Sequence, residues 1–344
     1  MNPIISILII THNQRYLLER CLDSVLNQKI DVPYEIIVSD DGADDGTKDY
    51  VQQLCCSERV LGKKNLIELK YVYCSNEMTF GRIGWNKLSA YKQASGKYFV
   101  NVDADDFLIG EDLYQEEYEM LESHPECSMV QTCLLMLDDG DNIEKIRKGY
   151  PFSEKLENGV KYSLEDFIRY KLIGQHQTYM YRRRPQDDME QLLGLGFDDY
   201  NITYYHLQFG PVVFLDKTGY VWVQYPNSAS HGKTNDENVF FTLLLPLRLS
   251  MQKAFEKSKY VLLSGGFCWF TSLIKIPPYY PKLGDVRNKE EAAPDIFIWK
   301  FFSGHHHRFR SWVRYVLIWL LLQVMNRLQI RSKFCLELLY KAMV

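Results

Sequence analysis

Three carboxylates within four residues form the part of this chain whose composition most strongly suggests chemistry. The apolar segment Tyr98–Val102 runs directly into Asp103, Ala104, Asp105 and Asp106. Carboxylates this close together repel one another unless a cation lies among them. A hard divalent cation, Mg²⁺ or Mn²⁺, bound through oxygen and shared with a diphosphate, would supply that charge. A solvated acidic turn is the alternative interpretation, because turns are often acidic.

Polar residues also follow two earlier strand-like segments. The first segment ends in Thr11 and Asn13, and the second ends in Asp40 and Asp41. In an open parallel sheet the carboxyl ends of the strands lie along one edge, where ligands bind. We therefore expect these residues to gather around a nucleotide together with Asp103. The sequence has no GxxxxGK[ST] loop, which argues against a phosphate cradle of that type.

The elements that must position these residues alternate along the first hundred residues. Continuous apolar runs and helical stripes predict strands at Ile4–Ile10, Tyr34–Val38, Leu66–Tyr73 and Tyr98–Val102, and helices at Tyr16–Gln28, Thr47–Leu54 and Ile83–Ala94. Strands and helices that alternate at this spacing predict an α/β fold with a mostly parallel sheet flanked by helices.

The pattern is less regular after Asp106. We expect further helices at Asp112–Glu122, Ser163–Lys171 and Asp198–Phe209, and strands at Cys127–Leu137, Val212–Leu215 and Tyr220–Gln224. Residues 138–160 are acidic and contain glycine, so they are expected to form an exposed excursion. A further strand-like segment, Thr178–Tyr181, follows Gln175, His176 and Gln177, a polar group that could face an acceptor.

Composition excludes some classes of protein. The 40 basic and 44 acidic residues nearly balance, so no overall nucleic-acid footprint is visible. The 8 cysteines show no CxxC metal spacing, which indicates reduced thiols in the cytoplasm rather than a disulfide framework. No basic segment precedes Ile4–Ile10, so we expect this run to be a buried strand and not a signal peptide.

The C-terminal region differs in kind from the rest. Residues 301–344 carry seven Lys or Arg side chains against one acidic residue, and Tyr315–Met325 is strongly apolar. This run is too short to span a bilayer, which takes about 20 residues. A basic amphipathic helix in the membrane interface is therefore predicted, and a helix docked on the core or on a partner subunit is the alternative. We expect a catalytic domain over residues 1–235 and a helical, basic, membrane-associated region over residues 236–344.

Three segments in order resemble family 2 glycosyltransferases, the inverting enzymes of GT-A fold that include bacterial surface-polysaccharide transferases. The opening ISILIITHNQRYLLERCLDSVLNQ with YEIIVSDDGADDGT looks like the start of that family. GKYFVNVDADDFL is similar to its strand that ends in a DxD motif. GLGFDDYNITYYHLQFGPVVFLD resembles its acidic pair at the start of a helix. The resemblance implies a GT-A domain that binds a nucleotide-sugar.

The resemblance also implies roles for the donor-side residues. Thr11 and Asn13 would line the nucleotide pocket, and Asp40 and Asp41 would lie near the uracil and ribose. Asp103 would contact the ribose or a metal-bound water. Each of these residues matches a motif position at a predicted strand end.

Metal and base are implied in the same way. Asp105 would hold Mg²⁺ or Mn²⁺ on the diphosphate, with Asp103 beside it. Asp199, the second residue of the acidic pair, would be the base that deprotonates an acceptor hydroxyl. Acidic residues also favour helix N-termini on electrostatic grounds, which is a purely structural reading of Asp198 and Asp199.

This chain departs from the family pattern at several positions. The family often has a basic residue immediately before the position of Asn86, where this chain has Trp85; Arg82 could supply that charge from one turn earlier. Asn86 itself is expected at the donor site. His231 lies where the family often carries a histidine-containing loop, so it is a candidate for metal or phosphate contact.

These features together predict transfer of a sugar from a UDP-sugar to a lipid-linked or growing glycan acceptor, with Asp199 as base. The setting would be surface-polysaccharide synthesis at the inner face of the cell membrane. One alternative is a sugar-phosphate nucleotidyltransferase, although the Gly-rich, basic loop expected after its first strand is absent here. The other is a non-catalytic, membrane-associated glycan-binding subunit, which would not need Asp103, Asp105 and Asp199 together.

Overall fold

A computed structural model describes residues 2–42, 44–75, 82–138, 146–148, 157–163, 176–184 and 199–225, all of which belong to one compact unit. The predicted basic C-terminal region, the domain boundary at residue 235 and most of the predicted helix Ser163–Lys171 lie outside these residues. Those predictions remain untested.

The first hundred residues fold as the sequence predicts, apart from the short helix α3, which was missed. Four strands alternate with helices: β1 (Ile5–Thr11), α1 (Arg15–Leu26), β2 (Tyr34–Asp40), α2 (Thr47–Cys55), α3 (Glu58–Leu61), β3 (Leu66–Tyr73), α4 (Arg82–Gln93) and β4 (Tyr98–Asp103). Every residue of β1 and β2 is buried, as expected for strands covered on both faces. The predicted stripe of α1 is buried in full, at Leu17, Leu18, Cys21, Leu22, Val25 and Leu26.

The second half of the domain contains shorter and more varied elements. They are β5 (Phe107–Leu108), α5 (Leu113–Ser123), β6 (Met129–Asp138), β7 (Ile146–Lys148), β8 (Lys161–Tyr162), the 3₁₀ helix η2 (His176–Thr178), β9 (Tyr179–Arg182), α8 (Asp199–His206) and β10 (Val212–Gln224). The sequence patterns identified α5, β6, β9 and α8 but missed β5, β7, β8 and η2, which span only two or three residues each.

One strand prediction was wrong. The two short strands predicted at Val212–Leu215 and Tyr220–Gln224 are a single strand, β10. Its pairing with β6 is irregular between Phe214 and Tyr220, where the register shifts twice. Lys217 lies in this stretch and forms ion pairs with Asp112 and Glu116. Polar residues at this bulge interrupt the apolar pattern without ending the strand.

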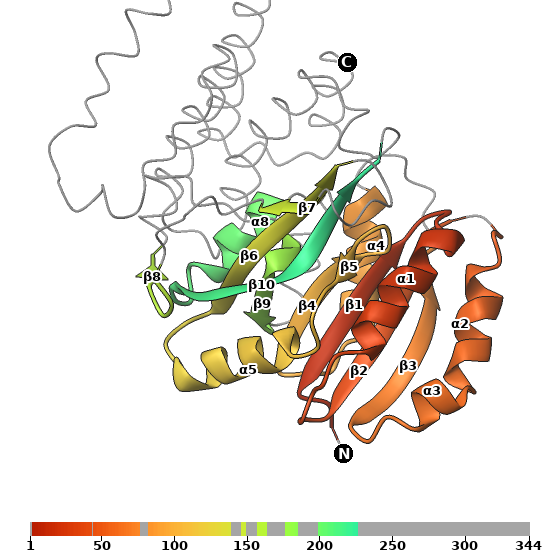
Figure 1. Cartoon of the computed structure of the whole chain (residues 1–344), viewed down its shortest axis with the longest axis horizontal. Coiled ribbons are helices and arrows are strands. Elements are labelled where there is room, and N and C mark those ends of the chain that lie inside the picture. The colour runs from red at the N-terminus through yellow and green to blue at the C-terminus, as the bar shows by residue number, and fades with distance from the viewer. Residues whose placement is uncertain are drawn as a thin grey trace, which may run out of the picture. The chain divides into compact units, whose positions relative to one another are not determined.

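The strands form one mixed sheet in the order β3-β2-β1-β4-β9-β6-β10-β5, with β7 added to β6 and β8 added to β10. Strands β1, β2, β3 and β4 are parallel to their neighbours in this set, whereas β9 runs antiparallel to both β4 and β6. Because the chain runs from β1 through β2 to β3 and then returns to β4, right-handed crossovers place α1 and α2 on one face and α4 on the other. Figure 1 shows α1 lying across β1, with α2 and α3 beside β3.

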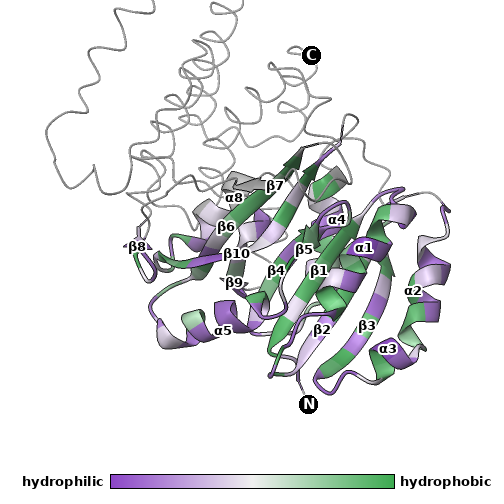
Figure 2. Cartoon of the chain, in the orientation of Figure 1, coloured by the Kyte–Doolittle hydropathy of each residue, from purple (hydrophilic) through white to green (hydrophobic). Residues whose placement is uncertain are grey.

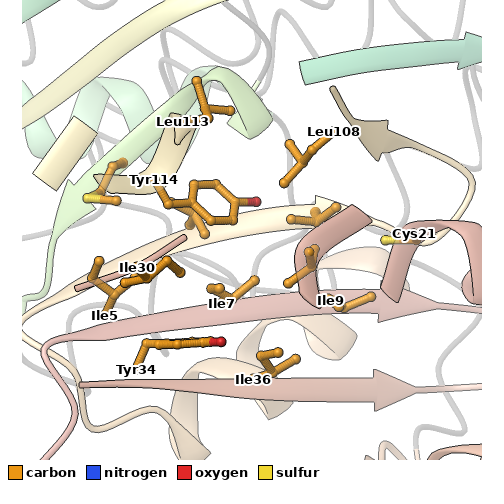
Figure 3. Close-up of a cluster of buried hydrophobic side chains, with 14 of the residues drawn as sticks. Ile5, Ile7, Ile9, Cys21, Ile30, Tyr34, Ile36, Leu108, Leu113 and Tyr114 are labelled. Carbon is orange, nitrogen blue, oxygen red and sulfur yellow. The ribbon is translucent and has the colours of Figure 1, made fainter. Parts of the chain in front are cut away.

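A large apolar cluster fills the space under α1 and α5. Ile5, Ile7 and Ile9 of β1 point to one side of the sheet and meet Leu113 and Tyr114 of α5 (Figure 3). Figure 2 shows the same division on the ribbon: β1 and β6 are mostly hydrophobic, and α3 and α5 carry many hydrophilic residues. This packing fixes the strands, and therefore the loops at their ends.

A buried carboxylate holds the amino ends of the strands together. Glu35 of β2 is 2% exposed. One of its oxygens accepts hydrogen bonds from the Ser6 hydroxyl at 2.7 Å and from the Ser95 backbone N–H at 2.7 Å and hydroxyl at 2.9 Å. The other oxygen lies 3.2 Å from Lys70 Nζ. Burial alone would raise the pKa of Glu35, but these hydrogen bonds outweigh it and lower the pKa.

Candidate active site

The carboxyl ends of three neighbouring strands bring the predicted site residues together. In the parallel register Thr11 lies opposite Asp40, and Ile10 lies opposite Asp103. Thr11, Asp40 and the Asp103 turn therefore occupy adjacent positions along one edge of the sheet, as the sequence predicted. This arrangement is the frame of the candidate site.

The loop after β2 is shaped by Asp40. Its carboxylate accepts hydrogen bonds from the Gly42 backbone N–H at 2.8 Å and from the Tyr71 hydroxyl at 3.1 Å. A side chain at Gly42 would come within 2.7 Å of the backbone nitrogen of Asn13, which has a left-handed φ of 53°. Burial raises the pKa of Asp40 even though both hydrogen bonds favour its charged form. In this structure Asp40 ties the loop after β2 to Tyr71 of β3, and its contact with a base or ribose stays a prediction.

Three more predicted residues line this corner of the site. Asp41 is nearly buried, and its carboxylate lies 3.0 Å from Nδ1 of His12. The side-chain amide of Asn86, from α4, donates to the Thr11 backbone carbonyl at 3.0 Å. The buried Thr11 hydroxyl and the Asn86 amide oxygen have no hydrogen-bond partner within the described parts of the chain. Buried polar groups without partners are uncommon in proteins and suit a site that a polar ligand completes.

Asp103 is held by three side chains that come from outside its own strand. Gln177 Nε2 donates to one carboxylate oxygen at 2.7 Å. The other oxygen faces Lys87 Nζ at 3.7 Å and His176 Nε2 at 3.5 Å. Burial would raise the pKa of Asp103, but the charge of Lys87 and the hydrogen bond from Gln177 hold it well below its usual range. Asp103 is therefore ionised and firmly oriented.

Asp106 joins the turn to β10 and shares the side-chain amide of Gln177 with Asp103, at a longer distance of 3.4 Å. One of its oxygens accepts a hydrogen bond from the Tyr220 hydroxyl at 2.6 Å, and the other accepts from the Val223 backbone N–H at 2.8 Å. Burial, with the charges of Asp105 and Asp103, raises its pKa well above the usual value. The third carboxylate of the acidic group thus ties the turn to β10.

Asp105 lies between these two carboxylates in the turn, and its charged form is also disfavoured. Burial and the nearby charge of Asp103 raise its pKa to about 6, against a smaller opposing effect of a hydrogen bond from Gln14. Arg20 supports the turn through the backbone, since its Nη2 donates to the Asp105 carbonyl at 3.2 Å and to the Tyr225 hydroxyl at 3.0 Å. A cation beside Asp105 would remove the unfavourable effect on its charged form.

The donor atoms at this edge fit a hard divalent cation. Asp103 and Asp105 offer carboxylate oxygens, which Mg²⁺ and Mn²⁺ prefer. Within the described ranges, no three His, Cys, Asp or Glu side chains gather closely enough to hold a metal ion by themselves. The residues present therefore suit an ion that a second ligand, such as a diphosphate, helps to hold.

The remaining predicted residues are only partly described. Asp199 is the first residue of α8 and Arg82 is the first of α4, as expected, but only their backbones are described. His231 lies outside the described residues. Their predicted roles as base, donor contact and metal ligand stay predictions.

Sequence reasoning missed Lys87 altogether and gave His176 and Gln177 a different role. Both belong to η2, and they contact Asp103 rather than stand apart from it. The sequence did carry a signal for His176 and Gln177, because these two polar residues directly precede a strand-like segment. Lys87 gave none, because a lysine in a helix is usually exposed.

No helix in the described part of the chain is long and apolar enough to cross a membrane.

Comparison with known proteins identifies one family and several relatives. The model of "Glycosyl transferase family 2" matches residues 6–185. The chain is 30% identical over 173 residues to the "GalNAc(5)-diNAcBac-PP-undecaprenol beta-1,3-glucosyltransferase" of Campylobacter jejuni, a match that covers 50% of each chain. It is 26% identical over 213 residues to the "Putative teichuronic acid biosynthesis glycosyltransferase TuaG" of Bacillus subtilis, covering 58% of this chain and 76% of that one. The match thus spans only half the length of the Campylobacter relative.

The fold is also similar to that of a solved structure. The structure of S. aureus TarS in complex with UDP-GlcNAc aligns with a TM-score of 0.55 at 18% identity, and the alignment covers 79% of this chain and 73% of that one. This similarity confirms the GT-A-like α/β architecture expected from the sequence.

Proposed function

Since this chain belongs to glycosyl transferase family 2, we propose that it moves a sugar from a UDP-sugar to a lipid-linked or growing glycan acceptor during surface-polysaccharide synthesis. The named relatives support the acceptor class, because one acts on an undecaprenol-linked glycan and the other is assigned to teichuronic acid synthesis. The UDP-GlcNAc complex of a protein with this fold supports the donor class.

The observation that carries the proposal is the meeting of polar strand ends around Asp103 and Asp105. Thr11, Asn13 and Asp41 line the side where a nucleotide would lie, with Asn86 beneath them. Mg²⁺ or Mn²⁺ bound by Asp105 would neutralise charge that develops on the departing diphosphate. Asp103, held by Gln177 and Lys87, is proposed to accept a hydrogen bond from the ribose.

Asp199 is proposed as the general base. As an acceptor hydroxyl attacks the anomeric carbon, Asp199 takes the hydroxyl proton; the new C–O bond forms while the bond from that carbon to the UDP oxygen breaks. One direct displacement with a single base inverts the configuration at the anomeric carbon. Arg82 and His231 are proposed contacts of the donor phosphates, His231 also as a metal ligand.

We further propose that the basic region after residue 235 associates with the inner face of the cell membrane. An acceptor that is attached to a lipid is confined to that surface, so an enzyme held there meets it more often. The seven basic residues of 301–344 would favour anionic lipids.

The proposal is tested by release of UDP from a panel of UDP-sugars, with Mn²⁺ or Mg²⁺ and then with EDTA. One donor should be hydrolysed slowly by the wild type, and chelation should abolish the reaction. With an acceptor present, Asp199→Asn should lose transfer but still bind UDP, whereas the exposed Asp31→Asn should behave as wild type.

Two results would contradict the proposal. Release of pyrophosphate from UTP and a sugar phosphate would identify a nucleotidyltransferase. Glycan binding without turnover of any donor, unaffected by Asp199→Asn, would identify a non-catalytic subunit.

A further inference from the structure

Lys87 is a buried cation behind the acidic turn. The residue is 1% exposed, and its ammonium lies 2.6 Å from Nε2 of His176 and 3.7 Å from Oδ1 of Asp103. The three residues come from α4, η2 and the end of β4. A lysine ammonium has only donors, so at this distance His176 Nε2 is the acceptor and the imidazole is neutral.

The burial of the Lys87 ammonium destabilises the fold. Taking an ammonium out of water costs several kcal/mol, and an apolar side chain in place of a buried ion pair is often no less stable. The burial of the neighbouring Asn86 has a structural reason, because its side-chain amide donates a hydrogen bond to the backbone of β1. Lys87 instead directs its charge at one carboxylate of the site.

The three carboxylates of the turn have different partners. Asp106 is bound to β10 through Tyr220 and Val223, and it also accepts a hydrogen bond from Gln177 at 3.4 Å. Asp103 has one oxygen bound by Gln177 and the other facing Lys87 and His176. Asp105 is affected by a hydrogen bond from Gln14 and by the charge of Arg20, whose guanidinium donates to the Asp105 backbone carbonyl.

Resting on the proposed function, we propose that Lys87 is a positioning residue that keeps Asp103 from ligating the cation, so that the divalent ion binds at Asp105 together with the donor diphosphate and only weakly before it. With Lys87 present, its charge offsets that of Asp103, so the ion would be held mainly through Asp105. Without Lys87 the charge of Asp103 would no longer be offset, and both carboxylates could hold the ion.

The test measures binding of Mn²⁺ alone by electron paramagnetic resonance, on the full chain without nucleotide. Lys87→Met should bind Mn²⁺ about tenfold more tightly than wild type. The substitution removes the positive charge of Lys87, which repels the ion in a partly buried site. Lys87→Gln removes the charge but keeps a donor for His176, and it should behave like Lys87→Met. Lys92→Met, on the exposed side of the same helix, should not change the affinity.

The second measurement repeats the titration with UDP at saturation. UDP should tighten Mn²⁺ binding strongly in wild type and about tenfold less in Lys87→Met, and by linkage Mn²⁺ should tighten UDP binding by the same smaller factor in the variant. A merely structural role for Lys87 would weaken binding in both titrations and would not raise the affinity for free Mn²⁺.

The outcomes separate this inference from the proposed function. Wild type that binds Mn²⁺ with UDP, alongside Lys87 variants with unchanged or weaker affinity for free Mn²⁺, would overturn the role of Lys87 and leave the transferase intact. Wild type that binds UDP but never Mn²⁺ would overturn both the role of Lys87 and the proposed metal.

Discussion

Two carboxylates at opposite ends of the same sheet, the buried Glu35 and the partly buried Asp105, show how the same chemical group serves two purposes. At the amino ends of the strands, Glu35 accepts three hydrogen bonds on one oxygen and pairs with Lys70 on the other, and its pKa is lowered. At the carboxyl ends, Asp105 is crowded by Asp103 and its pKa is raised to about 6. A buried carboxylate with a full set of donors stabilises the fold. One that lacks them costs stability, and the proposed cation would offset that cost.

The largest expected effect concerns Asp105, at the carboxyl ends of the strands. Asp105→Asn should lower the rate of UDP-sugar turnover about a thousandfold, because a divalent cation contributes several kcal/mol to stabilising the leaving charge. Single-turnover UDP release with saturating Mn²⁺ measures this effect. The change should leave the fold intact, so near-wild-type turnover would show that the cation binds elsewhere.

The second prediction concerns Glu35, at the amino ends of the strands. Glu35→Ala should lower the free energy of unfolding by about 3 kcal/mol, because it leaves the buried Ser6 hydroxyl without an acceptor and Lys70 without its buried partner. Urea unfolding at neutral pH measures the loss. Turnover per folded molecule should stay close to wild type. A thousandfold loss of turnover in this variant would mean that Glu35, like Asp105, is needed for activity.

The sequence showed the functional end more clearly than the structural one, for physical reasons. The sequences of buried parallel strands are continuous apolar runs. The polar residues that follow Ile4–Ile10 and Tyr98–Val102 are therefore easy to recognise. Asp103 and Asp105 could be predicted from that local contrast. Glu35 lies inside a strand, and nothing near it in the sequence marks its partners Ser6 and Ser95.

The partners of Asp103 show where local reasoning ends. Lys87 and His176 are 89 residues apart, and their contact follows from the return of the chain at η2 beside β4. Helical periodicity places Lys87 in α4 but does not say that its charge points inward. The single strand β10 was hidden for the same reason, since its bulge is defined by pairing with β6 and by ion pairs of Lys217 to α5.

A pair of glycines provides a matched comparison of the two ends. A side chain at Gly42 would lie 2.7 Å from the Asn13 backbone nitrogen, and one at Gly96 would lie 2.7 Å from the Ser6 hydroxyl oxygen. Each alanine substitution should therefore lower the free energy of unfolding by about 2 kcal/mol through overpacking. Thermal unfolding measures that cost, and calorimetric titration measures UDP affinity.

Only one of the two glycine variants should affect the ligand. Gly42→Ala pushes against Asn13 in the loop after β1 and against the Asp40 carboxylate, so its UDP affinity should fall about tenfold for a shift of one or two hydrogen bonds. Gly96→Ala should bind UDP as wild type does. Equal losses of affinity in both variants would mean that the amino-end cluster also controls the site.

The smallest expected effect concerns stability and pH in EDTA. The pKa of Asp105 is raised to about 6 from an ordinary value of 3.8, so the folded state binds its proton more tightly than the unfolded chain does. Its charged form therefore costs stability in full above pH 6, and the cost disappears as the pH falls to 3.8.

Asp105→Asn removes that charge permanently and sharpens the contrast with Glu35. At pH 7.5 it should be more stable than wild type by about 1 kcal/mol, allowing for partial solvent access, and the difference should vanish near pH 4. Urea unfolding across this range measures the gap, with Asp31→Asn as an exposed control. Saturating Mn²⁺ and UDP should reverse the order at pH 7.5, because the ion binds the wild type and stabilises it by mass action. An Asp105→Asn protein that is less stable than wild type in EDTA would show that Asp105, like Glu35, is there to hold the fold.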